Sequence, residues 1–299
     1  MRIARGAKRA VALCFTILEA SCDFVCLSLA ARRRISHIGR ARWLHRWSRI
    51  LLDRWDVHVS CAGTMPATGI VASNHLGYMD VLLFSALGPC VFISKSEVKR
   101  WPVFGILATA AGTIFVDRQR TRSTAEVNRQ IESAMGSGVA VVLFPEGTSS
   151  NGATILPFRS ALFEAAIRSG AIVTPAHVSY GIAEGCVEED VCYWGEMYFA
   201  PHLLKLLCLD GVDAKIRFGR AIQGQVDRKK AASLTRESVI GLAGLPPSHQ
   251  DPQPTGQIWA WQTRRGDCQD RGSRGPAPRQ SHLTRLSSTV KGNRVRSQL

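Results

Sequence analysis

A histidine and an aspartate stand five positions apart in the segment VASNHLGYMD, where a predicted strand passes into a predicted helix. On one continuous helix, side chains at this spacing would point about 140° away from each other. His75 and Asp80 can meet only if His75 lies in the loop and Asp80 in the first helical turn, which Gly77 would ease. An aspartate that accepts a bond from one imidazole nitrogen leaves the other nitrogen free as a general base. Taken alone, the pair also fits a structural loop histidine beside a helix-capping aspartate, so both interpretations stay open.

Charged residues also follow two other predicted strands. In GTIFVDRQR the strand ends at Asp117 and Arg118, where the guanidinium group either grips a phosphate or pairs with the aspartate. In VAVVLFPEGTSSNG the apolar run ends at Glu146, which either braces the loop or contacts a substrate. Ligand sites of α/β proteins lie at the carboxyl ends of parallel strands. Neither segment alone decides between its two interpretations.

Together the segments carry a family pattern. An N-H-x-x-x-x-D block at 74–80 is followed by G-x-x-F-x-x-R at 112–118, F-P-E-G-T at 144–148 and a strand that contains Pro175. In this order the four blocks resemble the lysophosphatidic acid acyltransferase family, the 1-acyl-glycerol-3-phosphate acyltransferases. They span residues 74–178, about a third of the chain. The first and third blocks are specific, and the other two are loose.

The resemblance implies roles for the residues at matching positions. His75 would take the proton from the hydroxyl group of a lysolipid, and Asp80 would orient His75. The resulting alkoxide would attack the acyl thioester directly, without an acyl-enzyme. The thioester, acyl-CoA or acyl carrier protein, would be a substrate, and no metal or other cofactor is expected. The substrate-binding residues implied are Asn74, Gly112, Arg118, Glu146, Gly147, Thr148 and, on the acyl-donor side, Pro175.

One departure from the family pattern bears on the acceptor. The third block usually continues with an arginine, and here that place holds Ser149. Phosphate recognition would then rest mainly on Arg118, with Arg120 and Arg159 as helpers. We expect 1-acyl-glycerol-3-phosphate as the acceptor, to give phosphatidic acid, with another lysolipid such as lyso-ornithine lipid as the alternative. The alternative of another class is a catalytically silent membrane-binding homologue, against which the intact histidine–aspartate pair argues.

These blocks lie in a stretch of alternating strands and helices. Between residues 57 and 245, β-rich runs alternate with helical patterns, which predicts an α/β acyltransferase domain with a largely parallel sheet flanked by helices. Strands are expected over 57–61, 69–73, 90–94, 113–116, 139–144, 171–179 and 214–218, with a further one over 191–199. Helices are expected over 79–87, 102–110, 124–136, 160–168 and 228–241.

Residues 1–56 are expected to form an amphipathic two-helix membrane motif. Residues 10–31 are apolar and long enough to span a bilayer, but Glu19 and Asp23 in their middle favour a helix lying in one leaflet over a span. In residues 40–55, tryptophans recur at helical spacing among arginines, which suits the headgroup boundary. The alternative is that the tryptophans pack on the acyltransferase domain, and both can hold at once.

The positive charge of the chain lies at its two ends. The formal net charge is +15, and residues 1–55 and 247–299 hold a surplus of Lys and Arg, whereas 56–246 are neutral. A nucleic-acid enzyme would carry this charge on its folded face, so we expect an anionic membrane surface as partner and no nucleic acid. Residues 246–299 are expected to be a disordered basic tail. Nine scattered cysteines favour a reduced protein on the cytoplasmic face of the membrane.

Overall fold

One mixed sheet of seven strands forms the centre of the structure, a computed structural model that describes residues 1–32, 35–116 and 123–245. The strands are β1 (Val57–Ala62), β2 (Ile70–Ser73), β3 (Cys90–Lys95), β4 (Ile114–Val116), β5 (Ala140–Leu143), β6 (Val173–Gly181) and β7 (Val212–Phe218). Their order across the sheet is β1-β7-β6-β2-β5-β3-β4, and all neighbours are parallel except β6 and β7. The predicted parallel sheet flanked by helices is confirmed.

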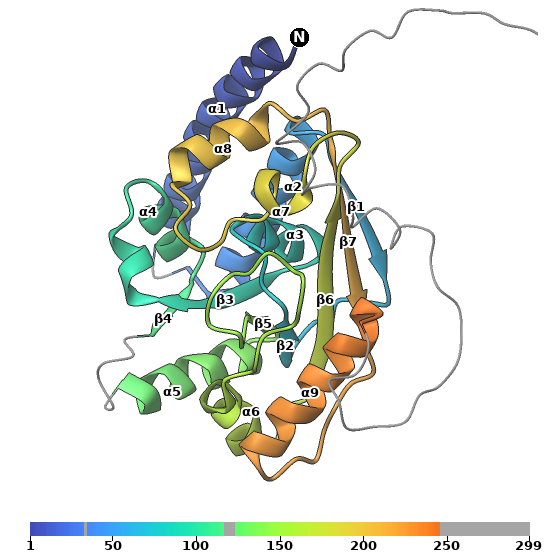
Figure 1. The fold of residues 1–299 in the computed structure, drawn as a ribbon. Coiled ribbons are helices and arrows are strands. Elements are labelled where there is room, and N and C mark those ends of the chain that lie inside the picture. The colour runs from blue at the N-terminus through green and yellow to red at the C-terminus, as the bar shows by residue number, and fades with distance from the viewer. Residues whose placement is uncertain (33–34, 117–122, 246–299) are drawn as a thin grey trace, which may run out of the picture. The chain divides into compact units, whose positions relative to one another are not determined.

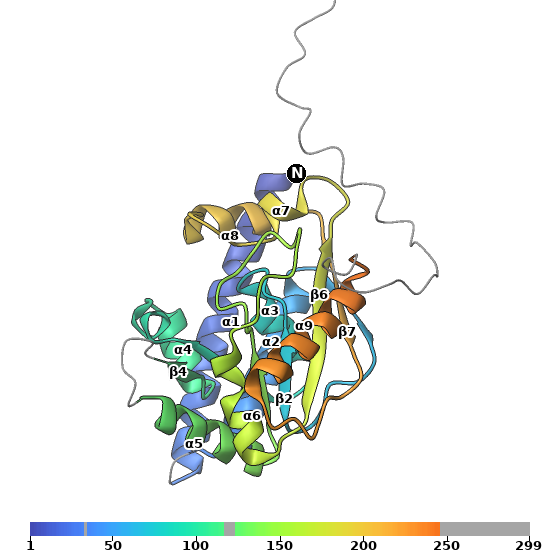
Figure 2. The same cartoon turned by 60° about the horizontal axis from the view of Figure 1, so that its bottom comes forward.

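Helices cover both faces of this sheet (Figures 1 and 2). One face packs against α5 (Ser123–Gly136), α6 (Glu164–Ser169) and α9 (Arg228–Ala243). The other face packs against α2 (His37–Arg54), α3 (Met79–Leu87) and α8 (Phe199–Leu207). Along β2, Ile70 faces the first layer and Val71 the second, as the two-residue period of a strand requires. Both layers are apolar, so the central strands β2 and β5 are buried on two sides.

Short elements connect these strands and helices. They include the 3₁₀ turns η1 (Ser96–Arg100) and η2 (Ser160–Phe163) and the helices α4 (Phe104–Ala110) and α7 (Val187–Asp190). The strand predicted over 191–199 is wrong, because these residues form an irregular connection between α7 and α8. Val191 and Cys192 in it are buried in the main core, so the apolar run marked burial and not a sheet position.

The tryptophans of α2 point into the protein. Trp43, and Trp55 directly after the helix, are 4% and 5% exposed. The Trp43 indole N–H donates to the Ala20 carbonyl over 3.1 Å, and that of Trp47 donates to the Asp23 carboxylate over 2.8 Å. Trp43 also shares a core cluster with Ala111 of the acyltransferase domain, so the tryptophan side of α2 packs on the preceding helix and on that domain, as in the alternative interpretation. The headgroup position expected for these side chains does not fit their burial.

Helix α1 (Arg2–Ala30) carries the exposed apolar surface instead. By length and composition it is long and apolar enough to cross a membrane. Its acidic residues lie on the side facing α2, where Glu19 pairs with Arg54 over 2.8 Å. The large apolar side chains on the opposite side follow one another at spacings of three, four or seven residues and are exposed: Val11, Phe15, Leu18, Val25 and Leu29.

Candidate active site

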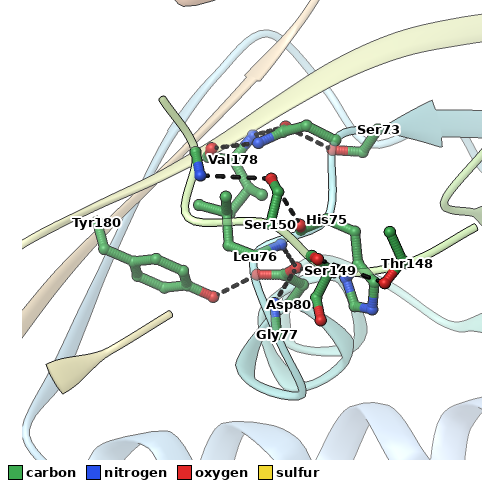
Figure 3. Close-up of polar contacts among 12 residues, drawn as sticks. Ser73, His75, Leu76, Gly77, Asp80, Thr148, Ser149, Ser150, Val178 and Tyr180 are labelled. Atoms are coloured by element: carbon green, nitrogen blue, oxygen red, sulfur yellow. Dashed lines mark hydrogen bonds and ion pairs between the residues drawn. The ribbon is translucent and has the colours of Figure 1, made fainter. Parts of the chain in front are cut away.

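The two specific sequence blocks meet at one edge of the sheet. β2 and β5 are parallel neighbours, with Ala72 paired to Leu143, so the loops that follow them leave from the same edge. We call residues 74–78 the His75 loop and residues 144–152 the Glu146 loop. The Ser150 backbone N–H donates to the His75 carbonyl over 2.9 Å, which ties the two loops together. Figure 3 shows His75 between Asp80 and residues 148–150 of the Glu146 loop.

The Asp80 carboxylate is fully buried and accepts four hydrogen bonds. Its Oδ2 accepts from His75 Nδ1 over 2.7 Å and from the backbone N–H groups of Leu76 and Gly77 over 2.6 and 3.1 Å. Its Oδ1 accepts from the Tyr180 hydroxyl over 2.5 Å. As the spacing predicts, His75 lies in the loop and Asp80 in the first turn of α3. The four donors together fix the orientation of the carboxylate.

The His75 imidazole is oriented on two sides. Its ring lies nearly flat on Phe144, with centroids 4.1 Å apart and planes 13° apart. Because Nδ1 faces the Asp80 carboxylate, the neutral ring carries its proton on Nδ1 and its lone pair on Nε2. The side chain is 22% exposed, and Nε2 has no hydrogen-bond partner among the described residues. This geometry suits a general base for a hydroxyl group that arrives from solvent or lipid.

The His75 loop is braced from behind by β6 and by the connection before α8. The Tyr193 backbone N–H donates to the Leu76 carbonyl over 2.8 Å, and a Cβ at Gly77 would lie 2.9 Å from that Tyr193 nitrogen. Asn74 is 1% exposed, and its side-chain amide exchanges two bonds with the Val178 backbone, of 3.0 and 2.8 Å. Both polar atoms of Asn74 are thus used within the protein, and its contact with substrate stays a prediction.

Glu146 is a buried carboxyl group with an unused oxygen. It is 4% exposed, and its Oε1 accepts from the Leu156 backbone N–H over 3.2 Å. Its Oε2 is buried and has no partner among the described residues. Burial raises the pKa of Glu146 to about 8, against the opposing effect of the backbone N–H groups of Leu156 and His75. The group therefore keeps unused hydrogen-bonding capacity.

The outer part of the Glu146 loop offers small polar groups. Gly147 turns the chain at φ +73°, and Thr148 beyond it is exposed. Ser149, at the place of the family's arginine, is half-buried (Figure 3). The exposed Arg159 lies nearby, since its Nε donates to the Glu146 carbonyl over 3.4 Å. The bond from Ser150 to the His75 carbonyl joins this loop to the His75 loop, and contact of its side chains with an acceptor head group stays a prediction.

Gly112, another predicted binding residue, is not brought to His75. It precedes β4 with φ +82°, a conformation that favours glycine. A Cβ at this position would meet the Arg40 side chain at 3.3 Å and Val91, near the start of β3, at 3.8 Å. Gly112 therefore lies toward the amino ends of the parallel strands, whereas the His75 loop lies at their carboxyl ends.

The last predicted residues are not placed at the His75 loop either. Pro175 is buried within β6 opposite Ala72, where β6 begins to pair with β7 at Ala176. Its role on the acyl-donor side stays a prediction. Arg118 and Arg120 lie outside the described residues. No group of three or more potential metal-ligating side chains occurs in the part of the chain that the structure describes.

Two residues of the site, Tyr180 and Ser150, were not predicted from the sequence. Tyr180 supplies the hydroxyl that bonds Asp80, and Ser150 supplies the backbone N–H that joins the two loops. Tyr180 lies near the carboxyl end of β6, a parallel neighbour of β2, so its end of the strand faces the His75 loop. A tyrosine at the carboxyl end of a parallel strand could therefore have been predicted as a site residue. Ser150 acts through its backbone N–H, so its residue type could not predict this contact.

Comparison with known proteins is consistent with these features. A family model described as "Acyltransferase" matches residues 56–179. The lyso-ornithine lipid O-acyltransferase of Brucella abortus is 36% identical over 58% of this chain and 70% of its own length. That of Rhizobium meliloti is 31% identical over 66% of this chain and 74% of its own length. The 1-acyl-sn-glycerol-3-phosphate acyltransferase of Neisseria gonorrhoeae is 40% identical over 37% of this chain and 44% of its own length.

Among solved structures, the 1-acyl-sn-glycerophosphate acyltransferase PlsC of Thermotoga maritima resembles this chain with a TM-score of 0.62. The match covers 82% of this chain and 97% of that protein. Sequence identity over it is 16%, so this likeness speaks for the fold alone.

Proposed function

We propose that this chain, which belongs to the lysophosphatidic acid acyltransferase family, transfers a fatty acyl chain from a thioester to a lysolipid hydroxyl with His75 as the general base. Lysophospholipid acyltransferase activity is the activity of that family. The observation that carries the proposal for His75 is its 2.7 Å bond to the buried Asp80, which directs the Nε2 lone pair outward. A silent binding protein has no need of a histidine held by a buried carboxylate with both oxygens bonded.

In the proposed reaction, Nε2 of His75 takes the proton of the acceptor hydroxyl. The acceptor oxygen attacks the thioester carbonyl carbon, a new C–O bond forms and the C–S bond breaks. The proton held by His75 then passes to the departing thiolate, so the products are an ester and a free thiol. The bond to Asp80 keeps the ring in one tautomer and stabilises the imidazolium that forms in between. The oxygen of Glu146 without a partner is a candidate contact for an acceptor hydroxyl.

We infer lyso-ornithine lipid as the acceptor. Relatives with this name match over 70% and 74% of their own length, which supports it over the phosphatidic-acid route that the motif pattern favours. Ser149 at the place of the family's arginine agrees, because an ornithine head group carries no phosphate. The second candidate is 1-acyl-glycerol-3-phosphate, favoured by the 40% identity of the shorter match. Only with this second acceptor would Arg118 bind a phosphate group.

The test is acyl transfer by the purified full chain. Labelled acyl-CoA and acyl carrier protein thioester are each offered with lyso-ornithine lipid or lysophosphatidic acid, and the lipid products are separated. We expect ester formation on lyso-ornithine lipid at least tenfold faster than on lysophosphatidic acid. A reversed preference selects the second candidate. The absence of any ester with every combination contradicts an acyltransferase function.

We also propose that α1 holds the protein on an anionic membrane at the cytoplasmic face. One side of α1 packs on α2 and α8, so only its outer side is available to lipid, as for a helix lying in the membrane surface. The glutamate and aspartate that argued against a span lie on the packed side. Beside α1, α4 presents exposed Ile106, and the turn before it presents Trp101 and Val103 next to Lys99 and Arg100. This mixture of apolar and basic groups also suits an anionic lipid surface.

Phe15→Glu tests the membrane proposal, with Val226→Glu as the control. Both positions hold exposed apolar side chains, 59% and 91% exposed, but Val226 lies in the loop before α9. Burial of one large apolar side chain is worth about 1.5–3 kcal/mol, so Phe15→Glu should weaken binding to phosphatidylglycerol-containing vesicles roughly tenfold or more. Equal binding of both variants in a flotation assay excludes the outer side of α1 as the lipid contact.

A further inference from the structure

We propose that Tyr180 is a positioning residue of the acyl-transfer site, which holds Asp80 so that Asp80 can hold His75. The proposal rests on the proposed function of the histidine–aspartate pair. Its observation is the 2.5 Å bond from the Tyr180 hydroxyl to Asp80 Oδ1, the oxygen that neither His75 nor the loop amides use. Tyr180 lies one position beyond the region matched by the family model, residues 56–179.

The fold brings Tyr180 to the site through the length of β6. β2 ends at Ser73, which pairs with Ala176, whereas β6 continues to Gly181 and so runs past the His75 loop. Two connections then join β6 to the segment 74–80. Asn74 bonds the Val178 backbone, and two residues further along the strand Tyr180 bonds Asp80. The side chains of Val178 and Tyr180, two residues apart, lie on the same side of the strand and share the core layer of α3, whose first turn carries Asp80.

The bond matters because the other Asp80 oxygen is shared. Oδ2 accepts from His75 and from two backbone N–H groups, and rotation of the carboxylate would exchange these contacts. A donor on Oδ1 opposes that rotation. Burial, and after it the Asp80 charge, raise the pKa of Tyr180 well above that of a free phenol, so the hydroxyl stays a donor. The titratable groups that also face Asp80 are His75, Glu146 and Cys192.

Tyr180→Phe removes this donor and keeps the ring. We expect kcat to fall about tenfold, with unchanged KM for thioester and acceptor. Loss of one hydrogen bond to a charged group lowers a rate by roughly ten- to a hundredfold when the bond acts wholly on the transition state. Tyr198→Phe is the control for loss of a tyrosine hydroxyl, because Tyr198 is 82% exposed and lies directly before α8, outside the His75 loop and the Glu146 loop. It should keep the kcat of the wild type within about twofold.

A double-mutant cycle with Asp80→Asn separates positioning from general structural support. If Tyr180 acts through Asp80, adding Tyr180→Phe to Asp80→Asn should cost less than twofold further. The inference is overturned if the two losses multiply, if KM alone changes, or if both Phe variants have the same kcat. It is also overturned if Tyr180→Phe fails to fold, since the hydroxyl would then support the fold itself. A wild-type protein without acyl transfer activity would instead contradict the proposed function.

Discussion

The His75 loop and the Glu146 loop leave neighbouring strands at one edge, but their polar groups are satisfied to different degrees. Behind the first loop, every oxygen of Asp80 and both polar atoms of Asn74 are hydrogen-bonded within the protein. The second loop keeps a buried Glu146 oxygen without a partner among the described residues, and it exposes Thr148. The difference suggests that the first loop fixes the reacting group, whereas the second leaves capacity for the substrate.

Asp80→Asn is the strongest test of how the His75 loop is held. An amide in place of the carboxylate cannot stabilise the imidazolium and can favour the wrong tautomer of His75, so we expect kcat to fall by about a hundredfold or more. Asp190→Asn is the matched control, because Asp190 is also buried and accepts a backbone N–H, from Cys186 over 2.7 Å. Steady-state kinetics and thermal unfolding of both variants check the expectation. Similar kcat values for both would remove the special role of Asp80.

Ser149→Arg tests the Glu146 loop. If the acceptor carries an ornithine head group, a further cation there repels its ammonium, and we expect acceptor use to fall about tenfold in kcat/KM. Use of lysophosphatidic acid should be unchanged or improved, since the arginine adds a phosphate donor. Ser137→Arg places the same charge at an exposed serine between α5 and β5, at the other end of β5 from the Glu146 loop, and serves as the control. Competition assays with both acceptors measure the ratio directly, and an unchanged ratio means that Ser149 does not face the head group.

The smallest expected effect is in the pH dependence of stability. The pKa of Glu146 is raised from 4.5 to about 8, so the folded protein holds this proton more tightly than the unfolded chain does. Glu146 therefore makes folding stability fall as pH rises through that range. Glu146→Gln should remove this contribution, so its unfolding temperature relative to wild type should rise from pH 5 to pH 8. Glu97→Gln, at an exposed glutamate of η1, should leave the difference constant. A constant difference for Glu146→Gln too would show that this carboxyl group is not buried as described.

The sheet and the His75–Asp80 contact could be predicted because their signals are local. The apolar runs that form β2 and β5 are continuous, and a spacing of five leaves one way for the two side chains to meet. Tyr180 escaped because its bond to Asp80 joins residues a hundred positions apart, and only the register of β6 against β2 brings them together.

The two N-terminal helices show the same limit. Both are amphipathic in sequence, and periodicity reports that one side is apolar without saying whether protein or lipid covers it. The structure buries the tryptophan side of α2 and leaves the outer side of α1 exposed. The place of Gly112 in the sheet could not be predicted for a similar reason, since a loose block gives a position in the chain but not an end of the sheet.

The central claim is that His75 removes the acceptor proton during direct acyl transfer. The most direct measurement compares ester formed and thiol released by wild type and His75→Ala, with lyso-ornithine lipid and an acyl thioester as substrates. We predict one ester per thiol for the wild type and a rate lower by about a hundred- to ten-thousandfold for His75→Ala, with an unchanged unfolding temperature. Near-normal ester formation by a folded His75→Ala protein would contradict the account.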